Sequence, residues 1–166
     1  MLVIGDREAL AWILSTQRMA FPGHRARSVA VLRPGDNLLL YTTRGCFRNP
    51  SRDRGRVMGH ATVTSAVSPL DVPVKFVDRT FPVGCALSIE SLAQYGTGVD
   101  LADQVSRMHA FPNPMTWSVY LRRPVVPLDG HDYALLHRAL RKIAFQPASV
   151  VPEYVVHGTP PRISGH

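Results

Sequence analysis

The stretch RPGDNLLLYTTRGCFRNPSRDRGRVMGHATV, residues 33–63, decides the fold. Its Pro-Gly pair predicts a turn, and the apolar run Asn37–Thr43 that follows has no polar face, which predicts a central strand. The segment Val57–Thr64 predicts a second strand, in which a glycine indicates a bulge or a close approach of two backbones. Residues 44–56 between the two strands are polar and break the pattern. The stretch therefore predicts a hairpin with a long basic loop.

The segments on either side of this hairpin predict a mixture of helices and strands. Upstream, Leu2–Ile4 predicts a short buried strand, and Asp6 is a natural N-cap for a helix whose apolar residues recur at helical spacing as far as Leu14. The segment Ser28–Leu32 fits either a short strand or a turn of helix. Further strands are predicted at 74–77, 85–92 and 116–121, and further helices at 99–108 and 129–143.

The order of these elements favours an α+β fold. Strands come in runs, with helices at the start, middle and end, which is typical of a small, strongly bent sheet or barrel flanked by helices. No internal repeat or interior linker divides the chain. Residues 1–145 are expected to form one domain, and residues 146–166 a Pro-rich C-terminal tail that is extended over the surface or partly mobile.

The composition narrows the functional class. With 166 residues, of which 45% are hydrophobic, the chain is large enough for one globular core. Two isolated cysteines without a CxxC motif or a signal peptide fit a reducing, cytoplasmic setting, and no apolar run approaches the roughly 20 residues that span a bilayer. The net charge of +7, carried almost entirely by arginine, favours acidic partners, although genomes rich in G and C also replace lysine by arginine.

Familiar catalytic motifs are absent from the sequence. There is no GxSxG, HExxH, P-loop or GxGxxG, and the scattered histidines give no pair with metal-ligand spacing. Cys46 lies in a positive environment that would lower its pKa, but no base partner is evident, and a buried or half-buried thiol is the commoner case. No catalytic residue, metal or cofactor is therefore expected.

The basic loop between the two central strands is the strongest local signal. It combines five arginines with an aromatic residue and flanking glycines, a pattern that can place guanidinium groups on phosphates while the aromatic ring stacks on or wedges beside a base. The alternative is a solvated hairpin loop in which Asp53 pairs with a neighbour. The candidate nucleic-acid-binding residues are Arg44, Phe47, Arg48, Arg52, Arg54 and Arg56.

Four strings carry a family pattern. LVIGDREALAWIL gives an opening strand and helix, and RPGDNLLLYTTRG gives a turn before an apolar strand that ends in tyrosine. GRVMGHATV gives the next strand, and the late segment FPNPMTWSVYLRRPVVPLDGHDY contains an asparagine-proline pair, a tryptophan and an arginine pair. In this order the strings resemble the EVE domain of the PUA-like superfamily, to which the YTH readers of N6-methyladenine and the ASCH domains are related. The resemblance covers about residues 1–144.

This resemblance implies a bent PUA-like barrel of five to six strands that binds a modified base near the end of the first helix. Asp6 then stands where related domains read the base edge, in competition with its capping role. Phe21 is the candidate wall, because no tryptophan stands in the segment that holds a cage tryptophan in the family. The candidate base pocket comprises Asp6, Phe21, Tyr41, Thr42, Thr43 and Trp117.

The expected function is a non-catalytic module that reads a methylated or hydroxymethylated base in DNA or RNA, with a separate nuclease or ATPase as a further partner. One alternative is an ASCH-like amidohydrolase acting on a modified nucleoside, for which Lys75, Glu90 and Thr42 or Thr43 are the available set. The other alternative is a protein-interaction module whose basic loop is a generic surface.

Overall fold

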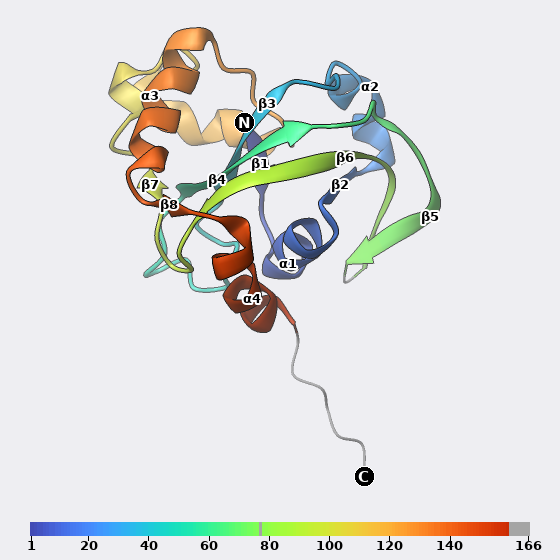
Figure 1. Cartoon of the computed structure of the whole chain (residues 1–166). Coiled ribbons are helices and arrows are strands. Elements are labelled where there is room, and N and C mark those ends of the chain that lie inside the picture. The colour runs from blue at the N-terminus through green and yellow to red at the C-terminus, as the bar shows by residue number, and fades with distance from the viewer. Residues whose placement is uncertain (77, 160–166) are drawn as a thin grey trace.

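The computed structural model describes residues 1–76 and 78–159. It confirms the α+β class, because a strongly curled mixed sheet forms a half-barrel with helices outside it (Figure 1). Helices α1 and α4 lie side by side against one side of the sheet, and α3 covers another part of it. No helix within these two ranges is long and apolar enough to cross a membrane.

The central path of the sheet runs in the order β1-β3-β4-β6-β2. Strands β1 and β3 are parallel, and the other pairs are antiparallel. Three further strands lie off this path: β5 and β8 pair with β6, and β7 pairs with β4. The bounds are β1 Leu2–Ile4, β2 Arg18–Phe21, β3 Asn37–Thr42, β4 Arg56–Val63, β5 Ser68–Phe76, β6 Arg79–Ala93, β7 Val99–Asp100 and β8 Ala144–Phe145.

The hairpin predicted from residues 33–63 is confirmed as β3 and β4. Leu39 lies opposite His60. The register shifts once in the β3–β4 pairing and once in the pairing of β4 with β6, each time at a bulge. A Cβ on Gly59 would lie 2.7 Å from the side chain of Leu92. Gly59 lies next to one of these bulges, which confirms the predicted irregularity in the strand, and the bulges help the sheet to curl.

Strand β6 joins the two halves of the curled sheet. Its first half pairs with β2 and β5, and its second half pairs with β4 and β8. A Cβ on Gly84 would lie only 2.2 Å from the carbonyl oxygen of Met19, so glycine is required where β2 crosses close to β6. This single long strand contains the segment 85–92 that was predicted as a strand.

Helix α1, Arg7–Thr16, begins as the sequence predicted. The Asp6 carboxylate accepts hydrogen bonds from the backbone N–H groups of Glu8 and Ala9, at 2.8 and 3.3 Å, which satisfies donors that the first turn leaves open. The helix ends at Gln17, whose φ of 52° is left-handed. Its buried face is Leu10, Ala11, Ile13 and Leu14.

The expectation of an extended or mobile tail after residue 145 is wrong for most of that segment. Pro147–Gly158 forms helix α4, which packs on α1. Pro147 lies in the first turn, where a missing N–H breaks no helical hydrogen bond, and the Tyr154 hydroxyl donates to the carbonyl of Ala93 at 2.9 Å. Residues 160–166, the end of the predicted tail, lie outside the described residues.

Other segments also differ from their predictions. The predicted strand 116–121 is part of the 3-10 helix η3, Pro114–Arg122, because Asn113 caps it through Met115 N and proline occupies its first turn. The predicted helix 99–108 is instead β7 and a short 3-10 helix. Strand β2, which directly follows α1, was not predicted. The remaining helices are η1 Gly23–Arg25, α2 Ala26–Val29, η2 Val105–Arg107 and α3 Gly130–Arg141.

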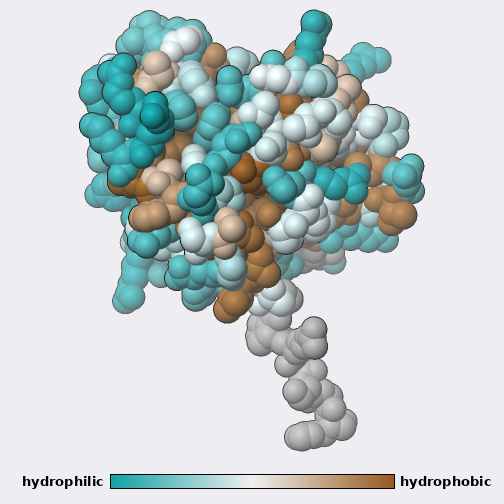
Figure 2. All heavy atoms as spheres, in the orientation of Figure 1, coloured by the Kyte–Doolittle hydropathy of each residue, from teal (hydrophilic) through white to brown (hydrophobic). Residues whose placement is uncertain are grey.

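The surface seen in this orientation divides by hydropathy. Figure 2 shows hydrophilic residues gathered over α3 and hydrophobic residues gathered lower, over α4, where Val156 is 73% exposed. The large apolar side chains of β3 and β4 are buried in one core.

Candidate functional site

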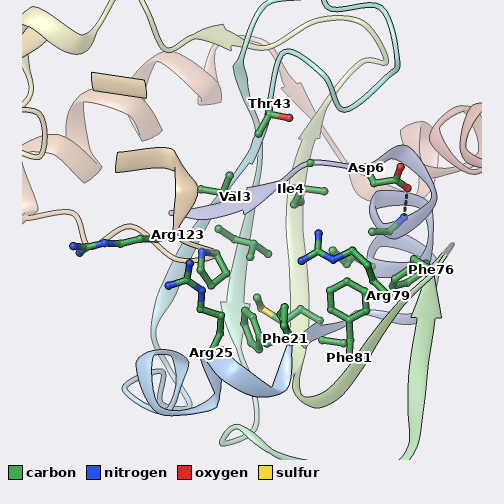
Figure 3. Close-up of a pocket in the computed structure, with 18 of the residues that line it drawn as sticks. Val3, Ile4, Asp6, Phe21, Arg25, Thr43, Phe76, Arg79, Phe81 and Arg123 are labelled. Carbon is green, nitrogen blue, oxygen red and sulfur yellow. Dashed lines mark hydrogen bonds between the residues drawn. The ribbon is translucent and has the colours of Figure 1, made fainter. Parts of the chain in front are cut away.

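A cavity of about 500 Å³ opens beside β1 and the first turn of α1 (Figure 3). Val3 and Ile4 of β1 and Phe21 of β2 form part of its wall. Thr43, at the end of β3, lies near its upper edge. The wall is mainly apolar, as small-molecule sites usually are, and the volume lies within their common range of about 300–1,000 Å³.

A segment distant in sequence closes one side of the cavity. The N–H of Val3 donates to the carbonyl of Pro124 at 2.8 Å, and the N–H of Val126 donates to the carbonyl of Met1 at 2.8 Å. Residues 121–124 therefore run along the open edge of β1 and contribute to the cavity wall. The chain after η3 thus supplies one side of the cavity by returning to the first strand.

The opposite side is aromatic. Phe76 and Phe81, from the β5–β6 hairpin, line the cavity and meet edge to face with ring centroids 5.5 Å apart. Trp12 of α1 packs against Phe76 at 5.8 Å. The guanidinium of Arg79 lies over the Phe81 ring, 5.4 Å from its centroid, a cation–π contact. The hairpin thus offers a ring surface with a positive charge held above it.

The cavity is also rich in positive charge. Four arginines, here called the arginine rim, line it from three separate parts of the chain. Asp6 is the single carboxylate among the lining residues that the structure describes. The cavity therefore favours a ligand that combines an apolar or flat part with negative charge. The arginine rim consists of Arg25, Arg79, Arg122 and Arg123.

Asp6 has its carboxylate at the edge of this cavity, but the group is already engaged. Oδ1 caps α1, and Oδ2 lies 3.6 Å from Nη2 of Arg48. The same Arg48 nitrogen is 3.1 Å from Glu8. The capping role anticipated for Asp6 is confirmed, and Oδ2 makes no capping bond.

The structure brings three of the six predicted base-pocket residues to the cavity: Asp6, Phe21 and Thr43. Phe21 is nearly fully buried, so it forms a wall without projecting into the opening. Thr43 reaches the cavity and Thr42 does not, because neighbouring side chains of a strand point to opposite faces.

The other three predicted pocket residues lie elsewhere. Tyr41 is in the core, where burial raises its pKa to about 12. Thr42 is buried and donates to the carbonyl of Arg56 at 3.4 Å. Trp117 lies in η3 and packs edge to face on Phe111, with centroids 6.0 Å apart. The resemblance implied that they share a pocket, but the topology places them outside this cavity.

The basic loop is partly neutralised by the chain itself. Arg48 pairs with Glu8 as described above, whereas Arg54 and Arg56 both pair with Asp100, at 2.9 and 3.1 Å. The predicted pairing by Asp53 is replaced by these carboxylates from outside the loop. Arg44 and Arg52 are exposed.

The loop also borders a second, smaller hollow of about 150 Å³, lined among others by Thr42, Phe47, Arg54 and Arg56. Phe47 packs edge to face on Tyr95, with ring centroids 5.3 Å apart. The ring predicted to stack on a base therefore already has an aromatic partner. The role of the loop in nucleic-acid binding stays a prediction.

The residues considered for catalysis do not come together. Cys46 is fully buried, and burial, with Asp6 and Asp53 nearby, raises its pKa to about 12, the opposite of an activated thiol. Within the described ranges, neither Lys75 nor Glu90 lines the cavity that Thr43 reaches. The set required for the amidohydrolase alternative is therefore not assembled there.

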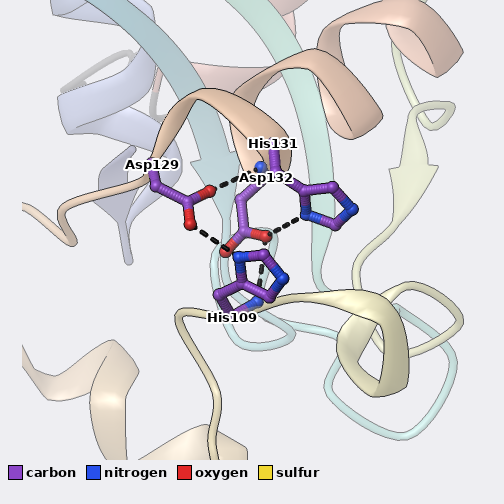
Figure 4. A group of neighbouring side chains, drawn as sticks. All are labelled: His109, Asp129, His131 and Asp132. Atoms are coloured by element: carbon purple, nitrogen blue, oxygen red, sulfur yellow. Dashed lines mark hydrogen bonds and ion pairs between the residues drawn. The ribbon is translucent and has the colours of Figure 1, made fainter.

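A separate cluster at the start of α3 contains residue types that bind metals (Figure 4). His109 and Asp129 form a pair at 2.7 Å, and the rings of His109 and His131 stack with centroids 4.3 Å apart. Buried Asp132 accepts from the backbone N–H groups of His109 and Ala110, at 2.9 and 2.7 Å. These bonds connect the loop before η3 to the first turn of α3. The cluster therefore has a structural role, since it holds these two segments together.

Solved structures share this architecture at low sequence identity. The NMR structure of Rpa0253 from Rhodopseudomonas palustris aligns with a TM-score of 0.51 and 16% identity, covering 83% of this chain and 92% of that one. A protein from Leishmania major, described as hypothetical, aligns with a TM-score of 0.50 and 14% identity, covering 84% and 93%. Their curled half-barrel sheets are compatible with a PUA-like fold. No protein-family model matches this sequence, and no curated protein matches it.

Proposed function

We propose that this protein is a non-catalytic module that reads a methylated or hydroxymethylated base in DNA or RNA by taking the base into the cavity beside β1 and α1. One observation carries the proposal: an aromatic, mainly apolar cavity of about 500 Å³ bears four arginines and a single carboxylate. A nucleotide has the matching chemistry, because it joins a flat ring to an anionic phosphate.

The energetics are compatible with base extrusion. Moving a base out of a duplex costs a few kcal/mol, and stacking on an aromatic side chain recovers about 1–3 kcal/mol per base. Phe76 and Phe81 supply rings, while Asp6 Oδ2 and the Thr43 hydroxyl can accept or donate at the base edge. A carboxylate accepts from an exocyclic amino group such as that of cytosine.

Selectivity for the modification would come from shape. An added methyl group that fits an apolar wall contributes about 1–3 kcal/mol, or 10- to 200-fold in affinity. The module itself would carry no effector chemistry, and a separate nuclease or ATPase would act at the site that it marks. Both cysteines are free thiols, which fits a cytoplasmic setting.

The proposal is tested by fluorescence anisotropy with single- and double-stranded DNA and RNA oligonucleotides. Each is prepared unmodified, with methylated or hydroxymethylated cytosine, and with methylated adenine, at two salt concentrations. We expect one modification to bind at least 10-fold more tightly than its unmodified counterpart. Equal affinity for every oligonucleotide would reject modified-base reading.

A variant pair links the preference to the cavity. Phe81→Leu removes a ring from the cavity wall, and Phe145→Leu makes the same change at an exposed phenylalanine on β8 that does not line the cavity. We expect Phe81→Leu to weaken binding of the preferred oligonucleotide by about 1–3 kcal/mol, and Phe145→Leu to leave it unchanged. Equal effects of the two changes would place the base elsewhere.

A further inference from the structure

The arginine rim and the basic loop differ in how much of their charge the protein itself neutralises. Three of the five loop arginines face carboxylates: Arg48 with Glu8, and Arg54 and Arg56 with Asp100. No rim guanidinium pairs with a carboxylate anywhere in the described ranges 1–76 and 78–159. The rim therefore has more uncompensated charge for a ligand than the loop has.

The rim arginines come from segments that meet only in the folded protein. Arg25 ends η1, Arg79 begins β6, and Arg122 and Arg123 end η3 and follow it. Figure 3 shows Arg25 and Arg79 on opposite sides of the cavity, with Arg123 extending outward on the same side as Arg25. Positive charge thus flanks the opening on both sides.

Arg79 is also held in place. Its guanidinium lies over Phe81, 5.4 Å from the ring centroid, so binding a phosphate would order less side-chain motion than it would for a freely moving arginine. A planar guanidinium can form two parallel hydrogen bonds with phosphate oxygens. The Phe81 ring therefore positions Arg79 for a phosphate contact at the edge of the cavity.

We propose that the nucleic-acid strand crosses the mouth of the cavity between Arg79 on one side and Arg25, Arg122 and Arg123 on the other. The phosphates on either side of the extruded nucleotide are then bound by the arginine rim, and the basic loop of residues 44–56 contributes little. This inference rests on the proposed function, since it assigns the backbone contacts of the strand whose base enters the cavity.

The test compares two double variants of equal charge. Arg25→Ala with Arg79→Ala removes two rim charges, and Arg44→Ala with Arg52→Ala removes two charges from exposed loop positions without a carboxylate partner in the described part of the chain. Anisotropy with the preferred oligonucleotide is recorded from about 50 to 200 mM salt. Thermal unfolding followed by circular dichroism confirms that both variants are folded.

We expect the rim variant to reduce the slope of log K against log salt by about two, because each lost phosphate contact reduces it by about 0.9. Over this fourfold rise in salt, the wild-type protein then loses about 10-fold more affinity than the rim variant does. The loop variant should retain the wild-type slope. A reduced slope in the loop variant with an unchanged slope in the rim variant would overturn the inference and leave modified-base reading intact.

A free modified nucleoside separates this inference from the proposed function. It carries no phosphate, so calorimetry should give the same affinity for the rim variant as for the wild-type protein. Loss of nucleoside binding in the rim variant would show that these arginines hold the base and not the backbone, which contradicts the inference. Failure of the wild-type protein to bind any oligonucleotide would reject both proposals.

Discussion

Asp6 shows at the scale of one residue how capping and recognition can share a carboxylate. Oδ1 accepts the two backbone hydrogen bonds that begin α1, while Oδ2 lies 3.6 Å from Nη2 of Arg48. Asparagine caps helices about as well as aspartate, and alanine costs about 0.5–2 kcal/mol. Asp6→Asn should therefore retain the stability seen in urea unfolding, whereas Asp6→Ala should lose about 1 kcal/mol.

The same two variants also report on recognition. If Oδ2 accepts from the exocyclic amino group of the bound base, Asp6→Asn weakens oligonucleotide binding although the helix remains capped. Unchanged binding by Asp6→Asn would assign the residue to capping alone.

His109 is a second residue for which the structure predicts a measurable property. Its hydrogen bond to Asp129, and the charge of that carboxylate, raise the pKa of His109 above 6.5, and the capping bond and His109 in turn lower the pKa of Asp129. The pair therefore stabilises the fold most between the ordinary pKa values of the two groups. Its contribution is lost as pH rises through the pKa of His109, or falls through that of Asp129.

An NMR titration of the histidine ring protons measures this directly. Asp129→Asn keeps an N-cap for α3 but removes the negative charge, so the pKa of His109 should return toward 6.5. His60 and His137 provide the internal comparison, because burial lowers both of their pKa values and neither should respond to this substitution. An unchanged His109 titration in the variant would show that Asp129 does not set it.

At the scale of elements, the contact between α1 and α4 depends on one glycine. A Cβ on Gly158 would lie 2.4 Å from Cβ of Ala11 and 2.7 Å from the carbonyl oxygen of Arg7. Overfilling such a contact typically costs about 1–3 kcal/mol, so Gly158→Ala should lower the free energy of unfolding by that amount. Gly130→Ala, at the start of α3, is the matched control, because its Cβ would meet nothing within 4 Å. Similar losses in both variants would deny a tight α1–α4 contact.

Helices and strands were predicted correctly where the apolar pattern, the turn residues and the capping residue all indicated the same element. The hairpin of residues 33–63 and the start of α1 were predicted correctly because apolar runs, turn residues and a cap agree there. Helix α4 was missed because its prolines, at 147 and 152, suggested an extended chain, although the first lies where a helix tolerates proline. Residues 116–121 were predicted as a strand because apolar and polar residues alternate there, whereas the asparagine-proline start directs them into η3.

In the molecule as a whole, the cavity is formed by segments that are far apart in the sequence and meet only through the topology of the sheet. The sequence alone could therefore predict only part of its lining. Asp6, Phe21 and Thr43 were anticipated through the family resemblance, which places the pocket near the end of the first helix. Arg79 gave no signal of its own, because it reaches the cavity only when β5 and β6 fold over α1. The arginine pair 122–123 was visible as a string, but its place depends on the backbone pairing that attaches residues 124–126 to β1.

Stability and recognition should therefore separate in this fold. Tyr154 of α4 is buried and donates to the Ala93 carbonyl, yet α4 contributes no residue to the lining of the cavity. Tyr154→Phe should cost about 1 kcal/mol for the lost hydrogen bond, and Tyr154→Ala about 3–5 kcal/mol for the lost ring. At temperatures well below unfolding, both variants should bind the preferred oligonucleotide as the wild-type protein does.

The same variants test whether the molecule unfolds as one unit. Trp12 packs beside the cavity hairpin and Trp117 lies in η3, so tryptophan fluorescence reports on two distant regions, and far-ultraviolet circular dichroism reports on the helices and sheet together. Because α1, α4 and the sheet share one buried core, the two signals should give the same urea midpoint in the wild-type protein and in Tyr154→Ala. If the dichroism transition of Tyr154→Ala preceded its fluorescence transition, α4, which contains no tryptophan, would unfold before α1 and the sheet.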